Sequence, residues 1–210
     1  MKPKRRVGGE HSVTRTAILD ATQNLMVKAG YASVSTRSVA AEAGVKPALV
    51  QYYFPTMDDL FLALYRRAAD QVAVRQAEAL ASDRPLQALW ELNADDARAG
   101  LAVEFMALAN HRKVIGAEMV KYVERARKEQ AEAIARLLPE SAEMTSPFPP
   151  AGIALLLAGA ARALIMEGGL GIALGHFEAR GIIERWVAAV HRGPVAPPPF
   201  ADAAPNSASD

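Results

Sequence analysis

The chain has 210 residues, of which 51% are hydrophobic, 6% are aromatic and none is cysteine. A chain of this length can bury a sizeable core in one large or two small domains. The absence of cysteine excludes disulfide bonds, thiol catalysis and Cys-ligated metals, and it is consistent with a reducing compartment. Many alanines and few aromatic residues favour packed helices over sheets.

The formal net charge is only +1, but the charges are unevenly distributed. Residues 1–56 hold eight Lys or Arg against three Asp or Glu, a balance of +5. The rest of the chain holds 16 Lys or Arg against 20 Asp or Glu, a balance of −4. The attraction for DNA phosphates is therefore expected in the N-terminal part.

Residues 1–12 lack apolar periodicity and hold a basic cluster, so we expect a flexible basic arm. Two interpretations stay open, a solvated tail and an arm that contacts phosphates or the minor groove. No basic start is joined to an apolar run, so we expect a cytoplasmic protein rather than a secreted one. The apolar stretch 151–175 could cross a bilayer by length, but Arg162 and Glu167 interrupt it. We expect a buried helix and a turn there, and no membrane partner.

Apolar residues recur at helical spacing along most of the chain, and no β-strand pattern is convincing. The predicted fold class is all-α with about nine helices. A proline-rich loop is predicted at 139–150, and a disordered tail at 193–210. Thr56 and Asp59 have the spacing of a capping box at the start of the fourth helix. The predicted helices cover residues 13–29, about 37–44, 47–53, 57–81, 86–95, 100–111, 115–138, 151–170 and 177–191.

The stretch 35–54 carries the most informative pattern. Ser35 or Thr36 caps a short helix, and Gly44 supplies the left-handed residue that ends it. Pro47 then stands in the first turn of a second short helix, where proline is tolerated. Two short helices joined by a glycine-containing turn make a helix-turn-helix, whose second helix fits the DNA major groove.

These residues and their flanks resemble the N-terminal DNA-binding domain of TetR-family transcriptional regulators. The matching positions are residues 15–21 (RTAILDA), Ala29-Gly30-Tyr31, Val39-Ala40, Ala43-Gly44-Val45, Tyr52-Tyr53-Phe54 and Leu60. The resemblance implies a helix-turn-helix DNA-binding domain at 13–56 and a helical ligand-binding and dimerisation domain at 57–192. An ordinary helical core with a glycine corner is the alternative interpretation.

The resemblance also implies which residues contact DNA. Gln51 is the best candidate for reading a base, because its amide can pair with adenine N6 and N7 together; a solvated glutamine is the alternative. This chain departs from the usual family residues at Leu49, Gln51 and Met57, so the usual contacts of those positions are not carried over. The predicted DNA-binding residues are Thr36, Arg37, Lys46, Pro47, Ala48, Leu49, Gln51, Tyr52 and Tyr53.

A ligand site in the body and a dimer interface on the last two helices are further implications of the resemblance. Each residue named for them has an ordinary core position as its alternative. The predicted ligand-binding residues are Trp90, Phe105, Met106, Asn110, Met119, Tyr122, Arg162 and Met166, with Arg162 and Glu104 as polar anchors. The predicted interface residues are Ile153, Leu156, Leu157, Ala160, Leu164, Ile183, Trp186, Val187 and Val190.

The sequence carries no catalytic constellation. The four histidines are scattered singly, without a metal-binding pair, a glycine-rich phosphate loop or a nucleophile elbow. We therefore expect no enzyme activity, no catalytic residues, no cofactor and no metal.

The predicted function is a ligand-responsive transcriptional regulator. A homodimeric repressor would hold a palindromic operator in double-stranded DNA until an unknown small-molecule effector releases it. One alternative is a constitutive or activating DNA-binding regulator without a ligand. A second alternative, from another class, is a helical small-molecule-binding or catalytic protein whose DNA-binding head is vestigial.

Overall fold

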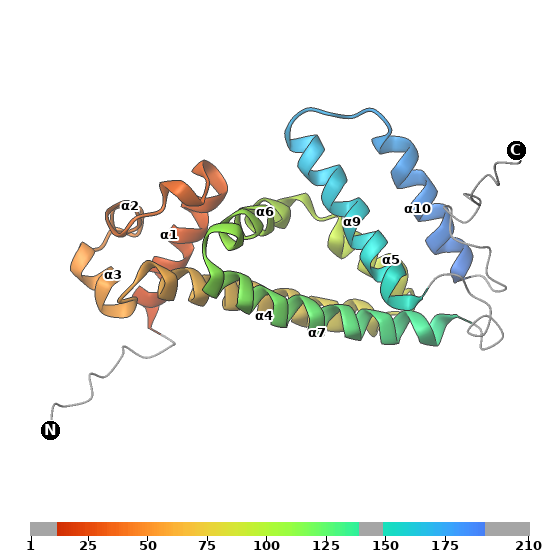
Figure 1. The fold of residues 1–210 in the computed structure, drawn as a ribbon, viewed down its shortest axis with the longest axis horizontal. Helices are drawn as coiled ribbons and strands as arrows, with labels where there is room; N and C mark the ends of the chain where they lie inside the picture. The colour runs from red at the N-terminus through yellow and green to blue at the C-terminus, as the bar shows by residue number, and fades with distance from the viewer. Residues whose placement is uncertain (1–11, 139–148, 192–210) are drawn as a thin grey trace, which may run out of the picture. The chain divides into compact units, whose positions relative to one another are not determined.

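The computed structural model describes residues 12–138 and 149–191, and the following account concerns these residues. Almost all of the predicted arm, almost all of the predicted 139–150 loop and the whole predicted tail lie outside them. The described residues form nine α-helices and one 3₁₀ turn, with no strand among them (Figure 1). The predicted all-α fold class is confirmed.

The predicted helices are present, with small differences at their ends. The 3₁₀ turn η1 (Tyr31–Ser33) was not anticipated from the sequence. The largest difference is at α6, which begins at Asp96 instead of residue 100. The helices are α1 (Val13–Ala29), α2 (Thr36–Glu42), α3 (Pro47–Tyr53), α4 (Met57–Leu80), α5 (Pro85–Asn93), α6 (Asp96–His111), α7 (Lys113–Leu137), α9 (Pro150–Gly169) and α10 (His176–Val190).

Local hydrogen bonds explain where α2 and α4 begin. Ser35 Oγ accepts from the Ser38 N–H at 3.1 Å, and Ser38 Oγ accepts from the Ser35 N–H at 2.8 Å. Thr56 Oγ1 accepts from the Asp59 N–H at 3.1 Å, and Asp59 Oδ2 accepts from the Thr56 N–H at 3.0 Å. Both are capping boxes, which satisfy backbone donors that a helix leaves unpaired. Gly44 has a φ of 65°, as the predicted turn between α2 and α3 requires.

The chain divides into two compact units, which are described separately. The first contains the residues up to Val72 together with Ala97–Val123. The second contains Ala73–Asp96 together with the residues from Glu124 onward. Helices α4 and α7 therefore each contribute to both units, and the domain boundary expected at residue 57 stays a prediction.

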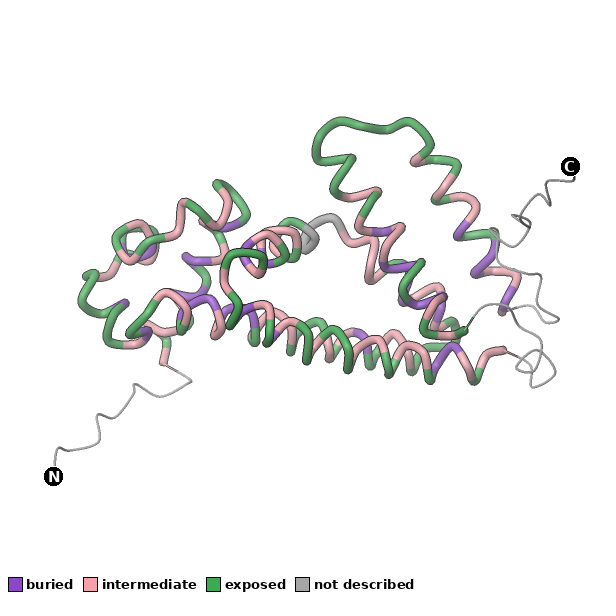
Figure 2. Tube along the Cα trace, in the orientation of Figure 1, coloured by how far each residue is buried: buried purple, intermediate pink, exposed green. Residues whose placement is uncertain are grey.

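The core of the first unit joins α1, α2, α3 and α4 to α6 and the start of α7 (Figure 2). Tyr65 lies edge-on to Phe105 and Tyr122, with ring centroids 5.2 and 5.6 Å away. Burial of each large side chain contributes about 1.5–3 kcal/mol, so this core holds α2 and α3 in a fixed relation. Its buried residues are Ile18, Leu19, Met26, Val39, Ala40, Val50, Phe54, Leu60, Phe61, Leu64, Tyr65, Phe105, Leu108 and Ile115.

The core of the second unit joins α5, the C-terminal part of α7, α9 and α10. By length and composition alone, α9 could cross a membrane. One face of α9 packs in this core instead, through residues that include Ile153, Leu157 and Ala161. We therefore interpret α9 as a core helix. The buried residues of the core are Leu86, Trp90, Ile134, Ile153, Ala154, Leu157, Ala161, Ile183, Trp186, Val187 and Val190.

Candidate nucleic-acid interface

Helix α3 has one buried face and one exposed face. Val50 and Phe54, at its centre and its C-cap, are buried in the first core. Leu49, Gln51 and Tyr52 point the other way and are exposed. A buried face fixes the helix while the opposite face is free to contact a partner, which is what a recognition helix requires.

Seven of the nine predicted DNA-binding residues are exposed, and two are partly buried. Thr36 Oγ1 lies 3.8 Å from Met57 Sδ, and the Tyr53 hydroxyl lies 2.7 Å from Ser12 Oγ. Thr36 and Tyr53, the two partly buried residues, therefore already have contacts within the first unit. The exposed seven are Arg37, Lys46, Pro47, Ala48, Leu49, Gln51 and Tyr52.

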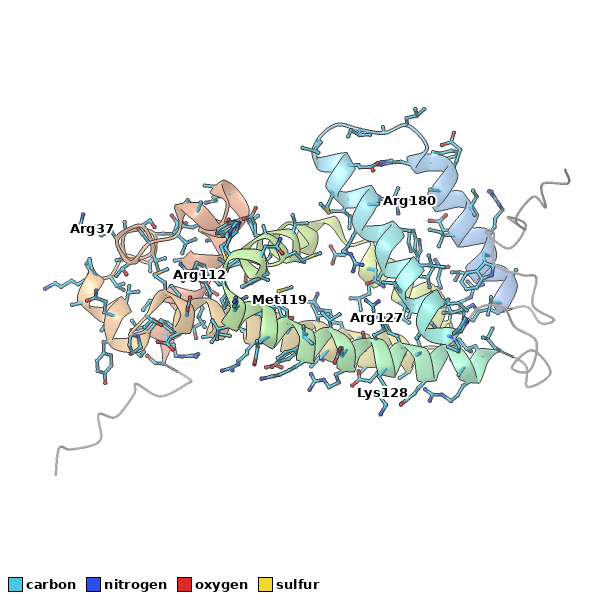
Figure 3. All side chains as sticks on the ribbon, in the orientation of Figure 1. Arg37, Arg112, Met119, Arg127, Lys128 and Arg180 are labelled. Carbon is cyan, nitrogen blue, oxygen red and sulfur yellow. The ribbon has the colours of Figure 1, made fainter. Side chains whose placement is uncertain are left out.

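Two cations lie at the starts of the helix-turn-helix elements. Arg37 is in the first turn of α2, and Lys46 is the N-cap residue of α3. Both are exposed, and neither has an ion-pair partner among the residues that the structure describes. Figure 3 shows Arg37 directed away from the core of the first unit. Together with the exposed N-terminal ends of α2 and α3, these cations suit contact with phosphate.

Helix α1 is tied to α3 and α4 by contacts between residues far apart in sequence. The Arg15 guanidinium carbon lies 5.3 Å from the centroid of the Phe54 ring, at the end of α3. Arg67 Nη1 of α4 donates to Asp20 Oδ1 of α1 at 2.6 Å. Pairs at such separations have no signature in helical periodicity, and sequence reasoning missed them.

Helix α6 and the start of α7 also contact the DNA-binding helices. Glu104 of α6 accepts from the Tyr31 backbone N–H at 2.7 Å, which fixes the turn after α1. Arg112 forms an ion pair with Asp58 in the first turn of α4 and lies over the Phe61 ring at 5.4 Å. One carboxylate oxygen of Glu104 is thus engaged within its own unit, and a role as ligand anchor stays a prediction.

A charged cluster joins α4 to α7 within the first unit. Arg66 Nε donates to Glu118 Oε1 at 2.6 Å, and Lys121 Nζ donates to Oε2 at 3.1 Å. The hydrogen bond from Arg66, followed by that from Lys121, holds the pKa of the Glu118 carboxyl below its ordinary value of 4.5. Nearby, burial raises the pKa of Tyr65 to about 12.

The predicted ligand-binding residues do not fall in one unit. Phe105 and Trp90 are buried in the first and the second core, so both pack as ordinary core residues. Met106 and Met166 are exposed by 45% and 48%. The first unit holds Phe105, Met106, Asn110, Met119 and Tyr122, and the second holds Trp90, Arg162 and Met166.

Most of the predicted dimer-interface residues are covered by their own chain. Leu156 is exposed by 50%, whereas Ala160 and Leu164 are partly buried against the second core. The remaining six lie inside that core of their own chain, and their place in a dimer interface stays a prediction. The sequence pattern of an apolar helix face is the same whether that face packs against its own chain or against a partner. The six are Ile153, Leu157, Ile183, Trp186, Val187 and Val190.

Residues 18–64 match the model of the family described as bacterial regulatory proteins, tetR family. This match contains all of α2 and α3 and the residues before and after them that build the first core. No curated protein matches the chain significantly.

Several solved structures share the fold. A transcriptional regulator from Rhodococcus sp. Rha1 is 21% identical, with a TM-score of 0.66 over 85% of this chain and 96% of that chain. A TetR transcription regulator from Haloarcula marismortui is 17% identical, with a TM-score of 0.67 over 84% of this chain and 97% of the other. A regulator from Saccharomonospora viridis, solved in complex with choline, is 20% identical, with a TM-score of 0.67 over 83% and 95%.

At these identities the likeness establishes the fold, and the family match establishes the kind of DNA-binding domain. The two findings agree with an exposed recognition face on α3 and with cations at the starts of the helix-turn-helix elements. Residues 18–64 therefore belong to a helix-turn-helix DNA-binding domain of the kind found in bacterial regulatory proteins of the tetR family, and the chain has the fold of solved transcriptional regulators.

Proposed function

We propose that the protein is a cytoplasmic, homodimeric repressor that leaves a palindromic operator when a small molecule binds its helical body. The observation that carries this proposal is the exposed face of α3, with Leu49, Gln51 and Tyr52, beside the unpaired cations Arg37 and Lys46. Exposed side chains on α3 can reach base edges, and the cations can neutralise phosphates.

A dimer is supported by the short length of α3, which has seven residues. A helix of this length reads only a few base pairs, and two copies in successive major grooves, about 34–36 Å apart, read a palindrome. The exposed face of α9 is the proposed contact between copies. It carries Leu155 and Leu156, exposed by 48% and 50%, and small residues at Gly159 and Ala163 that allow close helix approach.

Response to a small molecule is supported by the family, whose regulators typically act with small-molecule effectors, and by the choline complex of the Saccharomonospora viridis neighbour. An effector releases DNA only if it binds the DNA-free conformation more tightly than the DNA-bound one. Two contacts give such a conformational change a route within the first unit. Glu104 of α6 binds the turn after α1, and Arg112, between α6 and α7, binds Asp58 at the start of α4.

The experiment is a selection of bound fragments from genomic DNA, followed by titration of the complex with candidate small molecules. The expected result is a palindromic operator bound by two copies and released by one class of molecule. Binding that no molecule alters would replace the proposal by a constitutive regulator. A failure to bind any fragment specifically would contradict DNA regulation itself.

A further inference from the structure

The second unit holds three partly buried arginines without an acidic partner among the described residues. They are Arg75 on α4, Arg127 on α7 and Arg162 on α9. All three are partly buried rather than fully solvated. Arginine side chains at such depth are normally paired with carboxylates or backbone oxygens, so three unpaired ones in one compact unit require an explanation.

Arg75 has a buried guanidinium nitrogen, Nη1, with no hydrogen-bond partner in the part of the chain that the structure describes. The adjacent Gln76 is buried and well satisfied, since its Nε2 donates to the Ala126 carbonyl at 3.2 Å and to Glu129 Oε2 at 2.9 Å. The Glu129 carboxylate is therefore engaged by an amide at the crossing of α4 and α7. Arg75 precedes Gln76 in the sequence, and Arg127 follows Ala126. Neither arginine forms an ion pair with the Glu129 carboxylate.

Arg127 lies on the side of α7 that packs against α9. Ile134, seven residues further along the same helix face, is buried in the second core together with Leu157 and Ala161 of α9. Figure 3 shows Arg127 and Lys128 leaving α7 on opposite sides, with Arg127 on the side of α9. Arg162 follows Ala161 directly, so the two guanidinium groups come from helices in contact.

The electrostatics agree with this placement. Burial, followed by the positive charge of Arg127, lowers the pKa of Arg162. Two partly buried cations that repel one another destabilise the unliganded protein. Residues that oppose stability in this way are characteristic of binding sites, where the ligand supplies the missing interaction.

We propose that Arg75, Arg127 and Arg162 bind the anionic group, a carboxylate or a phosphate, of the effector. A guanidinium group donates two parallel hydrogen bonds to either anion, and a ligand anion would supply both the missing acceptor and the missing charge. The second core, which Ala161 beside Arg162 joins, is aliphatic and aromatic. The anionic group is therefore carried by an apolar molecule. This inference rests on the proposed function, because it names the chemical class of that effector.

The stability of the ligand-free protein separates a binding role from a structural one. If the arginines serve the fold, Arg162→Met and Arg127→Met lower the melting temperature. If they form an anion site, removing either charge relieves repulsion, and the melting temperature of the ligand-free variant equals or exceeds that of the unsubstituted protein. Lys128→Met is the matched control, because Lys128 is an exposed cation on the opposite side of the same helix.

The test uses the full-length protein and four probes with the same ten-carbon chain: decanoate, decyl phosphate, decanol and decyltrimethylammonium. Calorimetric titration and thermal unfolding are measured for each. The expected result is that at least one anionic probe binds and raises the melting temperature, with the neutral and cationic probes weaker by tenfold or more. Lys128→Met keeps this response, and Arg162→Met and Arg127→Met weaken anion binding by tenfold or more. The better of the two anions identifies the group as carboxylate or phosphate.

Three outcomes overturn the inference: no binding of either anion, equal binding of all four probes, or a lower ligand-free melting temperature for both arginine variants. None of these measurements uses DNA, so they are independent of the proposed function. Anion binding that leaves the operator complex intact would contradict only the ligand response. Release of the operator by a neutral or cationic effector would contradict only the anion site.

Discussion

Arg37 and Gln51 are both exposed, but their positions give them different tasks. Arg37 lies in the first turn of α2, where an exposed cation at a helix N-terminus suits a phosphate. Gln51 lies on α3 next to buried Val50, so its side chain is on the face away from the core. An amide at that place can pair with a base edge, whereas a contact to phosphate carries no sequence information.

Arg37→Ala is expected to weaken binding to operator and to random duplex alike, because phosphates are the same in both. It should also lower the slope of log affinity against log salt by about one unit per subunit. Gln51→Ala is expected to cost about 1–3 kcal/mol per half-site on the operator and little on random duplex.

Titrations of both variants on operator and scrambled duplex at two salt concentrations measure these effects. Equal weakening of both duplexes by Gln51→Ala, or no weakening, would show that Gln51 does not read sequence. Recognition would then rest on Leu49, Tyr52 or the shape of the DNA.

At the scale of elements, α4 is the helix through which the first unit connects its DNA-binding helices to α7. Its start is set by the Thr56 and Asp59 capping box, and its middle is joined to α7 by the Arg66 and Glu118 ion pair. Glu118 is buried, so its carboxylate depends on the two cations that face it, Arg66 and Lys121. This pairing makes the α4–α7 contact sensitive to pH.

Glu118→Gln is expected to lower the free energy of unfolding at neutral pH, and its effect is expected to disappear in acid. The folded-state pKa of Glu118 lies below the ordinary value of 4.5, so the charged form stabilises the fold above about that pH. This contribution is lost as the pH falls through the lowered pKa.

Denaturant unfolding of both proteins between neutral pH and pH about 3 measures the difference between them. A gap in stability that stays constant over the whole range would contradict a role for the charge. Glu78→Gln, at an exposed acid on α4, is the comparison for a general loss of negative charge.

At the scale of the whole molecule, the proposed contact between copies depends on which apolar surface of α9 its own chain leaves exposed. Trp186 is 8% exposed and packs inside its own chain. A charged residue at this position would disrupt the second core, so its effect on dimerisation could not be separated from misfolding. Leu156 is half exposed on the other face of α9 and is the better probe of contact between copies.

Leu156→Glu is expected to give folded monomers with a large loss of operator affinity, since a charge at an apolar interface is left without a partner. Val120→Glu, at an exposed apolar residue of α7, is the control and should remain a dimer. Sedimentation equilibrium measures the mass, and circular dichroism checks that both variants fold. A Leu156→Glu protein that sediments as an unchanged dimer would show that this face of α9 is not the interface.

Features that depend on neighbours a few residues apart could be predicted from the amino-acid sequence. The helix positions, the capping box at Thr56, the glycine turn at Gly44 and the two faces of α3 follow from local hydrogen bonds and from helical periodicity. The DNA-binding domain was predictable for the same reason, since its pattern is compact in sequence.

Features that join residues far apart in the sequence became visible in the three-dimensional fold. It assigned the carboxylate of Glu104 to the Tyr31 backbone, which no spacing predicts across that separation. It also placed Trp186 in its own core and left Leu156 exposed, because periodicity finds an apolar face without saying what covers it. The lack of an acidic partner for Arg162 among the described residues came from the same source, since it depends on every helix that surrounds this side chain.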